Sequence, residues 1–282
     1  MKKEEYIVNG FDENMDFLLS LNKLIEGKYS ELFFAVIAHG SVGTNEIIPY
    51  SDFDGLLIVK DHFINSQQLE KFKFESMKLI LKFDPLQHHG WFQITESQLS
   101  NYPQSYLPHE VLIGSKVIYP KIEKLELQVV FNIESLDYMQ SLKQLINSIE
   151  KQYINYESFK DVRVYELKSF LSKIMLLPSM YYAAKNEKGI FKKQSFDAVR
   201  FEFKEEEWAC IEMATLIRRN WSYNLNPIQR FVMTRPEIFF RRLTKKMVAP
   251  KPSKEIFDTI NEDFFKSLKL FIKKINKDIF VA

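Results

Sequence analysis

The stretch that decides the fold is LFFAVIAHGSVGTNEIIPYSDFDGLLIVK, which runs from Leu32 to Lys60. Residues 32–38 are almost all apolar, as is typical of a strand that is buried on both faces. Gly40 and Gly43 then interrupt the apolar run and favour a tight turn, in which the backbone can approach a ligand closely. Residues 55–59 are apolar again and predict a second strand.

Two aspartates, Asp52 and Asp54, stand at the start of this second strand. Side chains alternate along a strand, so both carboxylates are expected on the same face. Carboxylates this close repel each other unless a cation lies between them, and hard oxygen ligands suit Mg²⁺. The alternative is a glycine-rich hairpin with two solvated aspartates.

The order Gly40-Ser41, ten residues, then Asp52-Phe53-Asp54 resembles the nucleotidyltransferase signature of the DNA polymerase beta superfamily. The resemblance covers about thirty residues closely and the rest of the chain in outline. It implies an α+β fold, in which a polymerase beta-like domain with a small mixed sheet and flanking helices precedes an all-α helical bundle. It also implies that the two aspartates bind Mg²⁺ or Mn²⁺, and that the nucleotide is held by Gly40, Ser41, Gly43 and Ser51.

Enzymes of this superfamily usually add a third carboxylate from a neighbouring strand, and Asp84 is the candidate for this third catalytic and metal-binding position. Pro85 disfavours helical geometry at Asp84, which leaves the capping of a turn as an equal alternative. His88 and His89 are expected to begin a strand over residues 88–94 and to point to opposite faces. Each histidine either bonds a phosphate or has a structural role, and His39 is interpreted as a structural partner of the glycine turn.

The composition is that of a globular protein, with 282 residues of which 46% are hydrophobic and 27% charged. The net charge of +2 indicates no particular partner. One cysteine, Cys210, excludes an intramolecular disulfide and is consistent with a reducing compartment. The N-terminal residues have no apolar run typical of a secretory signal, and no run of 18 apolar residues predicts a membrane span. We therefore expect a cytoplasmic protein that does not enter a membrane.

The hydrophobic period changes to a helical one near Ser135. We predict a catalytic domain over residues 1–130 and a helical domain over residues 131–282 that packs against it and leaves a cleft between them. Predicted strands are 32–38, 55–59, 88–94 and, as the last, 116–119. Predicted helices are 11–28, 66–81 (with a change to strand near residue 78), 108–114, 136–156, 162–185, 205–221, 227–246 and 254–279.

Residues 173–221 resemble in outline the helical substrate domain of antibiotic nucleotidyltransferases. The resemblance rests on a glycine turn followed by Lys192 and Lys193 at a helix start, and it implies that these lysines bond a triphosphate. The alternative, to which we give equal weight, is that the two lysines lie in a solvent-exposed first turn of a helix. Glu166 is the residue we name as a general base.

A basic stretch from Leu216 to Lys254 contains ten lysines or arginines and one acid, Glu237. It is either a surface for an anionic partner or a charged face balanced by acids elsewhere. The aromatic residues within it lie at helical spacing and are therefore predicted to be core; they are Trp221, Tyr223, Phe231, Phe239 and Phe240.

These observations predict a Mg²⁺-dependent enzyme that moves a nucleoside monophosphate from a nucleoside triphosphate, with ATP expected, to an acceptor hydroxyl and releases pyrophosphate. A small-molecule acceptor is favoured, and protein or RNA stays open. One alternative is a toxin-like enzyme that nucleotidylates protein or tRNA. Another is a decayed module that binds nucleic acid or protein, against which the retained aspartates and Gly40-Ser41 argue.

Overall fold

The computed structural model describes residues 1–152 and 156–280. The chain forms two compact units, and the fold class is α+β. One unit consists of Met1–Leu136 together with Arg230–Arg241, and the other of Asp137–Gln229 together with Arg242–Ala282. A short segment far along the chain, Arg230–Arg241, therefore belongs with the N-terminal unit.

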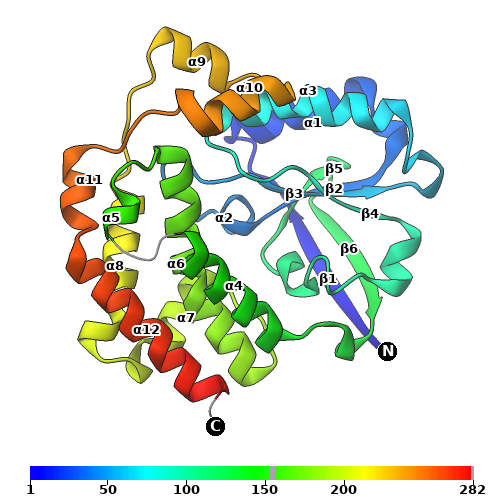
Figure 1. The fold of residues 1–282 in the computed structure, drawn as a ribbon. Helices are drawn as coiled ribbons and strands as arrows, with labels where there is room; N and C mark the ends of the chain where they lie inside the picture. The colour runs from blue at the N-terminus through cyan, green and yellow to red at the C-terminus, as the bar shows by residue number, and fades with distance from the viewer. Residues whose placement is uncertain (153–155, 281–282) are drawn as a thin grey trace. The chain divides into compact units, whose positions relative to one another are not determined.

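In the described part of the chain, a mixed six-stranded sheet forms the centre of the N-terminal unit (Figure 1). The strand order is β4-β3-β2-β5-β1-β6. The pairs β3–β4 and β1–β5 are parallel, and the pairs β2–β3, β2–β5 and β1–β6 are antiparallel. The strands are β1 (Lys2–Gly10), β2 (Phe33–His39), β3 (Asp54–Val59), β4 (Phe92–Thr95), β5 (Lys116–Tyr119) and β6 (Lys124–Phe131).

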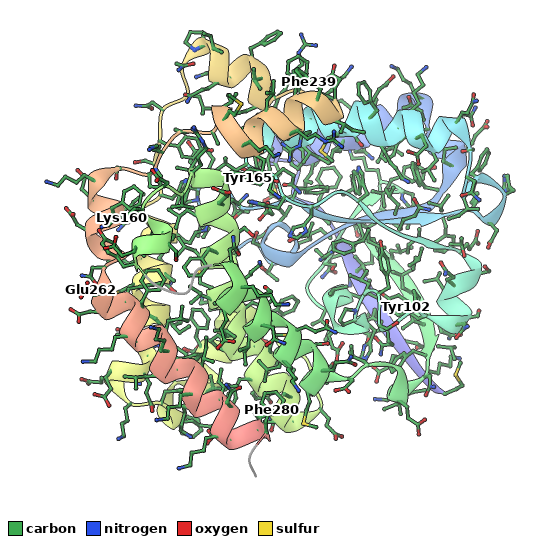
Figure 2. The ribbon with its side chains drawn as sticks, in the orientation of Figure 1. Tyr102, Lys160, Tyr165, Phe239, Glu262 and Phe280 are labelled. Atoms are coloured by element: carbon green, nitrogen blue, oxygen red, sulfur yellow. The ribbon has the colours of Figure 1, made fainter. Side chains whose placement is uncertain are left out.

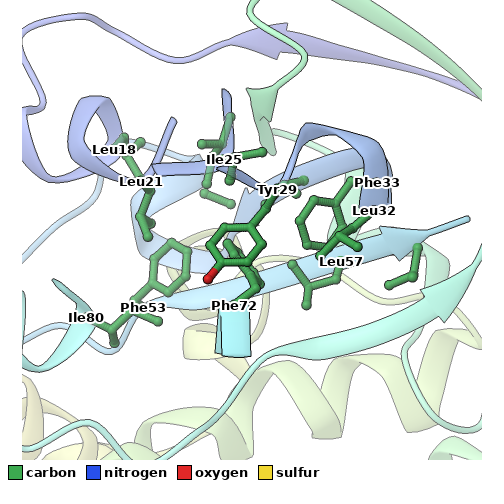
Figure 3. Packing of buried hydrophobic residues seen from close by; sticks show 14 of the residues in the cluster. Leu18, Leu21, Ile25, Tyr29, Leu32, Phe33, Phe53, Leu57, Phe72 and Ile80 are labelled. Carbon is green, nitrogen blue, oxygen red and sulfur yellow. The ribbon is translucent and has the colours of Figure 1, made fainter. Parts of the chain in front are cut away.

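Each face of this sheet carries its own apolar core. Helices α1 (Asp16–Lys28) and α3 (Gln67–Phe83) cover one face, and their apolar stripes pack on Phe33, Leu57 and other strand residues (Figures 1 and 3). The other face is covered by the segment between β4 and β5, which contributes Tyr102, Leu107 and Leu112. Because neighbouring residues on a strand point to opposite faces, β2 and β3 are nearly all apolar.

The structure confirms the predicted strands at β2, β3 and β5 and corrects the others. Two strands were missed: β1 and β6 pair with each other along their length, so β5 is not the last strand. The strand predicted over residues 88–94 is shorter and begins only at Phe92, because residues 84–91 form a loop. The predicted change to strand near residue 78 is wrong, since α3 continues to Phe83. Residues His109–Leu112 form a short 3₁₀ helix within the predicted 108–114.

The second unit is helical, as the period predicts. Predicted helix 227–246 is divided into two α-helices and a π-helix, and predicted helix 254–279 is broken near Ile260. Residues 153–155 of predicted helix 136–156 lie outside the described residues. The helices beyond the sheet are α4 (Tyr138–Gln152), α5 (Tyr156–Phe159), α6 (Val164–Asn186), α7 (Lys192–Val199), α8 (Glu205–Arg219), α9 (Pro227–Met233), α10 (Ile238–Leu243), the π-helix Thr244–Val248, α11 (Lys254–Thr259) and α12 (Glu262–Phe280).

A partly buried histidine on the second face of the sheet, His109, makes stability depend on pH. The ring of His109 stacks on Phe131 with centroids 4.2 Å apart, and its Nδ1 is hydrogen-bonded to the hydroxyl of Tyr6. Burial lowers the pKa of His109 below its ordinary value of 6.5, although the nearby Glu110 opposes this shift. Below pH 6.5 the unfolded chain therefore binds a proton that the folded protein resists, so the free energy of unfolding falls as the pH falls.

We expect the substitution His109→Asn to make the free energy of unfolding depend less on pH below 6.5. The asparagine amide can still hydrogen-bond Tyr6 but does not titrate. Urea unfolding at a series of pH values between 7 and 5 measures the effect. The matched control is His62→Asn at an exposed position. An unchanged slope in His109→Asn would contradict the assignment.

Candidate functional site

The turn after β2 is fixed by glycine. Gly40 has a φ of +62° and begins the helical turn α2 (Gly40–Gly43), which is closed by a hydrogen bond from the N–H of Thr44 to the carbonyl of Gly40 at 3.0 Å. A Cβ atom on Gly40 would lie 2.7 Å from Oδ2 of Asp54. The carboxylate of Asp54 is therefore packed directly against the start of the turn, and only glycine fits there.

The two aspartates flank a buried aromatic residue. Asp54 is the first residue of β3 and pairs with His39 of β2. Asp52 precedes the strand, so the prediction that both aspartates lie on it is wrong by two residues. Phe53, between them, is almost fully buried in the core under α1 and α3. The side chain of Asp52 is 15% exposed, and its Oδ1 accepts a hydrogen bond from the N–H of His88 at 3.1 Å.

Asp84 lies at the C-terminal end of α3 and is fully buried. Its Oδ1 accepts a hydrogen bond from the N–H of Leu86 at 3.0 Å, as in the turn-capping alternative. Its charge also raises the pKa of Tyr50, as a smaller effect beside burial. Among residues 1–152 and 156–280, no three His, Cys, Asp or Glu side chains lie close enough to share one metal ion, so Asp84 is not gathered with Asp52 and Asp54.

The three histidines near the site differ in their surroundings. His39 is buried against Phe92, and burial lowers its pKa to about 4, with a smaller contribution from His89. It is therefore neutral near pH 7. Nδ1 of His88 lies 3.6 Å from Oδ1 of Asp52, whereas His89 is exposed. Since residues 88–91 are not a strand, the argument that His88 and His89 point to opposite faces does not apply.

The remaining predicted residues of the turn have structural contacts. Ser51 is buried, and its Oγ accepts a hydrogen bond from the N–H of Ile48 at 3.0 Å, which closes the turn before Asp52. A Cβ on Gly43 would lie 2.9 Å from the carbonyl oxygen of Ala38, so close packing requires glycine there. Ser41 lies in the first turn of α2 and is half-buried.

The predicted residues of the helical half belong to the second unit. Lys192 and Lys193 form the first turn of α7. Oε2 of Glu166 accepts a hydrogen bond from the N–H of Arg163 at 3.2 Å, so this carboxylate caps the start of α6. The role of Lys192 and Lys193 in binding a triphosphate stays a prediction, and so does the role of Glu166 as a general base.

Three residues that the sequence analysis did not assign to the site support the aspartate segment or the loop beside it. Gln87 is fully buried and hydrogen-bonds the backbone of Phe53, and Arg241 donates to the carbonyl of Gln87. A Cβ on Gly55 would lie 2.3 Å from the ring of Trp91, so glycine is needed beside the aspartates for this ring to pack. Gly55, which directly follows Asp52-Phe53-Asp54, was a visible signal in the sequence. Gln87 had none, and Arg241 was only one cation of the basic stretch.

The aromatic residues of the basic stretch divide into two groups. Trp221 is buried as predicted, but Phe231 is 53% exposed, so for this residue the prediction of core is wrong. It is also wrong for Phe239, which is 66% exposed (Figure 2). The guanidinium of Arg235 lies over the ring of Phe231, 4.5 Å from its centroid. Phe231 lies in α9 and Phe239 in α10, and both of these short helices present apolar side chains to solvent.

The two carboxylates fit Mg²⁺, which is commonly held by one or two carboxylates together with substrate phosphates and water. The supporting observation is the packing of the Asp54 carboxylate against Gly40, because it places a hard oxygen ligand beside the backbone of a glycine turn.

A cavity of about 390 Å³ in the same unit is lined by other residues, among them Asn9, Lys121 and Glu123. No helix in the described part of the chain has the length and apolar character needed to cross a membrane.

No family model and no curated protein matches the chain. Among solved structures, it is similar to the crystal structure of spectinomycin adenyltransferase AAD(9) from Enterococcus faecialis with ATP and spectinomycin. The sequence identity is 14%, the TM-score is 0.43, and the match covers 82% of this chain and 99% of that chain. The neighbour is a nucleotidyltransferase, the kind of enzyme that the sequence motif resembles.

Proposed function

We propose that this protein is a nucleotidyltransferase that moves a nucleoside monophosphate from ATP to a hydroxyl group of a small molecule and releases pyrophosphate. The observation that carries the proposal is the contact between the Asp54 carboxylate and Gly40. It joins a carboxylate pair, which suits a divalent cation, to a glycine turn, which suits phosphate oxygens.

Asp52 and Asp54 would hold Mg²⁺ or Mn²⁺ together with the phosphates. When bound, the cation supplies neutralisation of the phosphate charge and a lower pKa for the acceptor hydroxyl. The backbone N–H groups of α2 and the hydroxyl of Ser41 would orient the β- and γ-phosphates. Asp84 is kept in the proposal as a third ligand, and its Oδ1 also accepts a hydrogen bond from the N–H of Leu86.

The half-buried position of the aspartates also serves the chemistry. Partial burial lowers the effective dielectric around the carboxylates, so their attraction for a cation is stronger than it would be at an open surface. The hydrogen bond from the N–H of His88 to Oδ1 of Asp52 orients this carboxylate. Lys192 and Lys193 are kept in the proposal as further ligands of the triphosphate.

The test is to incubate the protein with Mg²⁺ and ATP labelled at either the α- or the γ-phosphate, together with a panel of acceptors. The panel contains aminocyclitols such as spectinomycin, aminoglycosides, mixed tRNA and the protein itself. We expect the α-label to appear on a small molecule and the γ-label in pyrophosphate. Transfer of the γ-label to the acceptor would identify a kinase and contradict the proposal.

RNA is the second candidate acceptor, and the exposure of Phe231 and Phe239, with the guanidinium of Arg235 over the ring of Phe231, favours it. Exposed aromatic rings can stack on unpaired bases, while arginines bind phosphates. In this case the α-label should appear on tRNA, and RNA binding should weaken steeply as salt rises because counterions are released. The substitution Phe239→Ala should weaken RNA binding and leave ATP binding unchanged.

A further inference from the structure

The spacing of the two aspartates is fixed by one buried side chain. Oε1 of Gln87 accepts a hydrogen bond from the N–H of Phe53 at 2.8 Å, and its Nε2 donates to the carbonyl of Phe53 at 2.7 Å. The same Nε2 donates to the carbonyl of His89 at 3.1 Å. Phe53 separates Asp52 from Asp54. The amide of Gln87 therefore holds the backbone between the two aspartates through both the N–H and the carbonyl of Phe53.

The side chain of Phe53 adds a second constraint. Its ring packs edge-on against Phe17 and Trp91, with centroids 5.1 Å and 5.0 Å away. The aspartate segment is thus anchored through the ring of Phe53 on one side and through Gln87 along the backbone. The N–H of His88, the residue after Gln87, reaches Oδ1 of Asp52, so the same loop also orients one carboxylate.

Gln87 is itself held from two directions. Its N–H donates to the carbonyl of Asp84 at 3.1 Å, which closes the turn after α3. Its carbonyl accepts a hydrogen bond from Nη2 of Arg241, in the segment Arg230–Arg241 that belongs to the same unit. Arg241, 154 residues further along the chain, therefore stabilises the loop that contacts the aspartates.

We propose that Gln87, steadied by Arg241, is a positioning residue that sets the geometry of Asp52 and Asp54 for a divalent cation bound with a nucleoside triphosphate. This inference rests on the proposed function. Mg²⁺ tolerates little departure from octahedral geometry, so a small displacement of one carboxylate weakens its binding. An amide is suited to the position because it carries one acceptor for the N–H and one donor for the carbonyl of the same residue.

The test compares two buried glutamines in the same unit. Gln87→Met keeps the length of the side chain and removes its hydrogen bonds. Gln104→Met is the matched control, because Gln104 is also buried and its Oε1 accepts a hydrogen bond from the N–H of His109 at 2.7 Å. Both substitutions leave backbone groups without a partner and should lower the melting temperature.

The deciding measurement is the Mg²⁺ concentration that gives half-maximal binding of a fluorescent ATP analogue. In Gln87→Met we expect it to rise by about 10- to 100-fold, the range found when groups that orient metal ligands are removed. In Gln104→Met it should equal that of the wild type. Arg241→Met should raise it in the same direction by a smaller factor. If Gln87→Met does not fold, Gln87→Asn replaces it, because it keeps an uncharged amide and shortens the side chain by one methylene, which withdraws the amide from Phe53.

The outcomes separate the two proposals. Mg²⁺-dependent ATP binding that is equal in wild type and Gln87→Met would overturn the positioning role and leave the proposed function standing. An equal rise in Gln87→Met and Gln104→Met would also overturn it, since the effect would then follow from lost stability alone. Wild-type protein without Mg²⁺-dependent binding of the analogue would contradict the proposed function and, with it, this inference.

Discussion

Replacing Asp52 or Asp54 with asparagine is expected to reduce nucleotidyl transfer about a hundredfold or more, while the protein stays folded. Each change removes one negative charge and keeps the size of the side chain and one oxygen. The lost charge costs several kcal/mol of stabilisation for the cation and the phosphates in the transition state. Folding should not suffer, because the asparagine at position 52 can still accept the bond from His88 and because the repulsion between the carboxylates is relieved.

Thermal melts test this without knowledge of the acceptor. Mg²⁺ with ATP should raise the melting temperature of the wild type and should raise it much less in either variant. Asp258→Asn, which removes the same charge at an exposed position of α11, is the control and should respond like the wild type. Equal shifts in all four proteins would show that the aspartates do not bind the cation.

The substitution Gly40→Ala is expected to damage both stability and ligand binding. Its φ of +62° is left-handed, and an alanine there costs about 1–2 kcal/mol in the free energy of unfolding. The new Cβ would also lie 2.7 Å from Oδ2 of Asp54 and would push the carboxylate away from the turn. We therefore expect a lower melting temperature together with the loss of most Mg²⁺-dependent ATP binding.

The control for Gly40→Ala is Gly27→Ala in α1, where a new Cβ meets nothing within 4 Å. Alanine is the better helix former, so this variant should gain up to about 1 kcal/mol and bind ATP as the wild type does. Wild-type ATP binding in Gly40→Ala would contradict the close contact between the turn and Asp54.

The parts of the fold that were predictable have strong local periodicity. Local patterns of a few residues predict these elements: continuous apolar runs predict the strands β2 and β3, and apolar stripes at helical spacing predict the helices α1, α3 and α6. The strand β1 was missed because its charged residues 2–5 were interpreted only as the absence of a signal peptide. The strand β6 was missed although its residues 124–129 alternate between polar and apolar. These strands are set by pairing between residues about 120 positions apart, which no local pattern reports.

The candidate site divides in the same way. Asp52, Asp54 and Gly40 follow from a spacing that can be counted along the chain. Gln87 could not be predicted, because a side chain that bonds the backbone 34 residues away leaves no pattern in residue types. Arg241 acts 154 residues from its partner, and in the sequence it was only one cation of a basic stretch.

Diffraction from crystals soaked with Mn²⁺ and a non-hydrolysable ATP analogue tests the central claim most directly, because the anomalous signal locates the cation. The account predicts a peak at roughly 2 Å from carboxylate oxygens of both Asp52 and Asp54, with the phosphates against the turn from Gly40 to Gly43. A nucleotide bound with its Mn²⁺ peak away from these two carboxylates would contradict it.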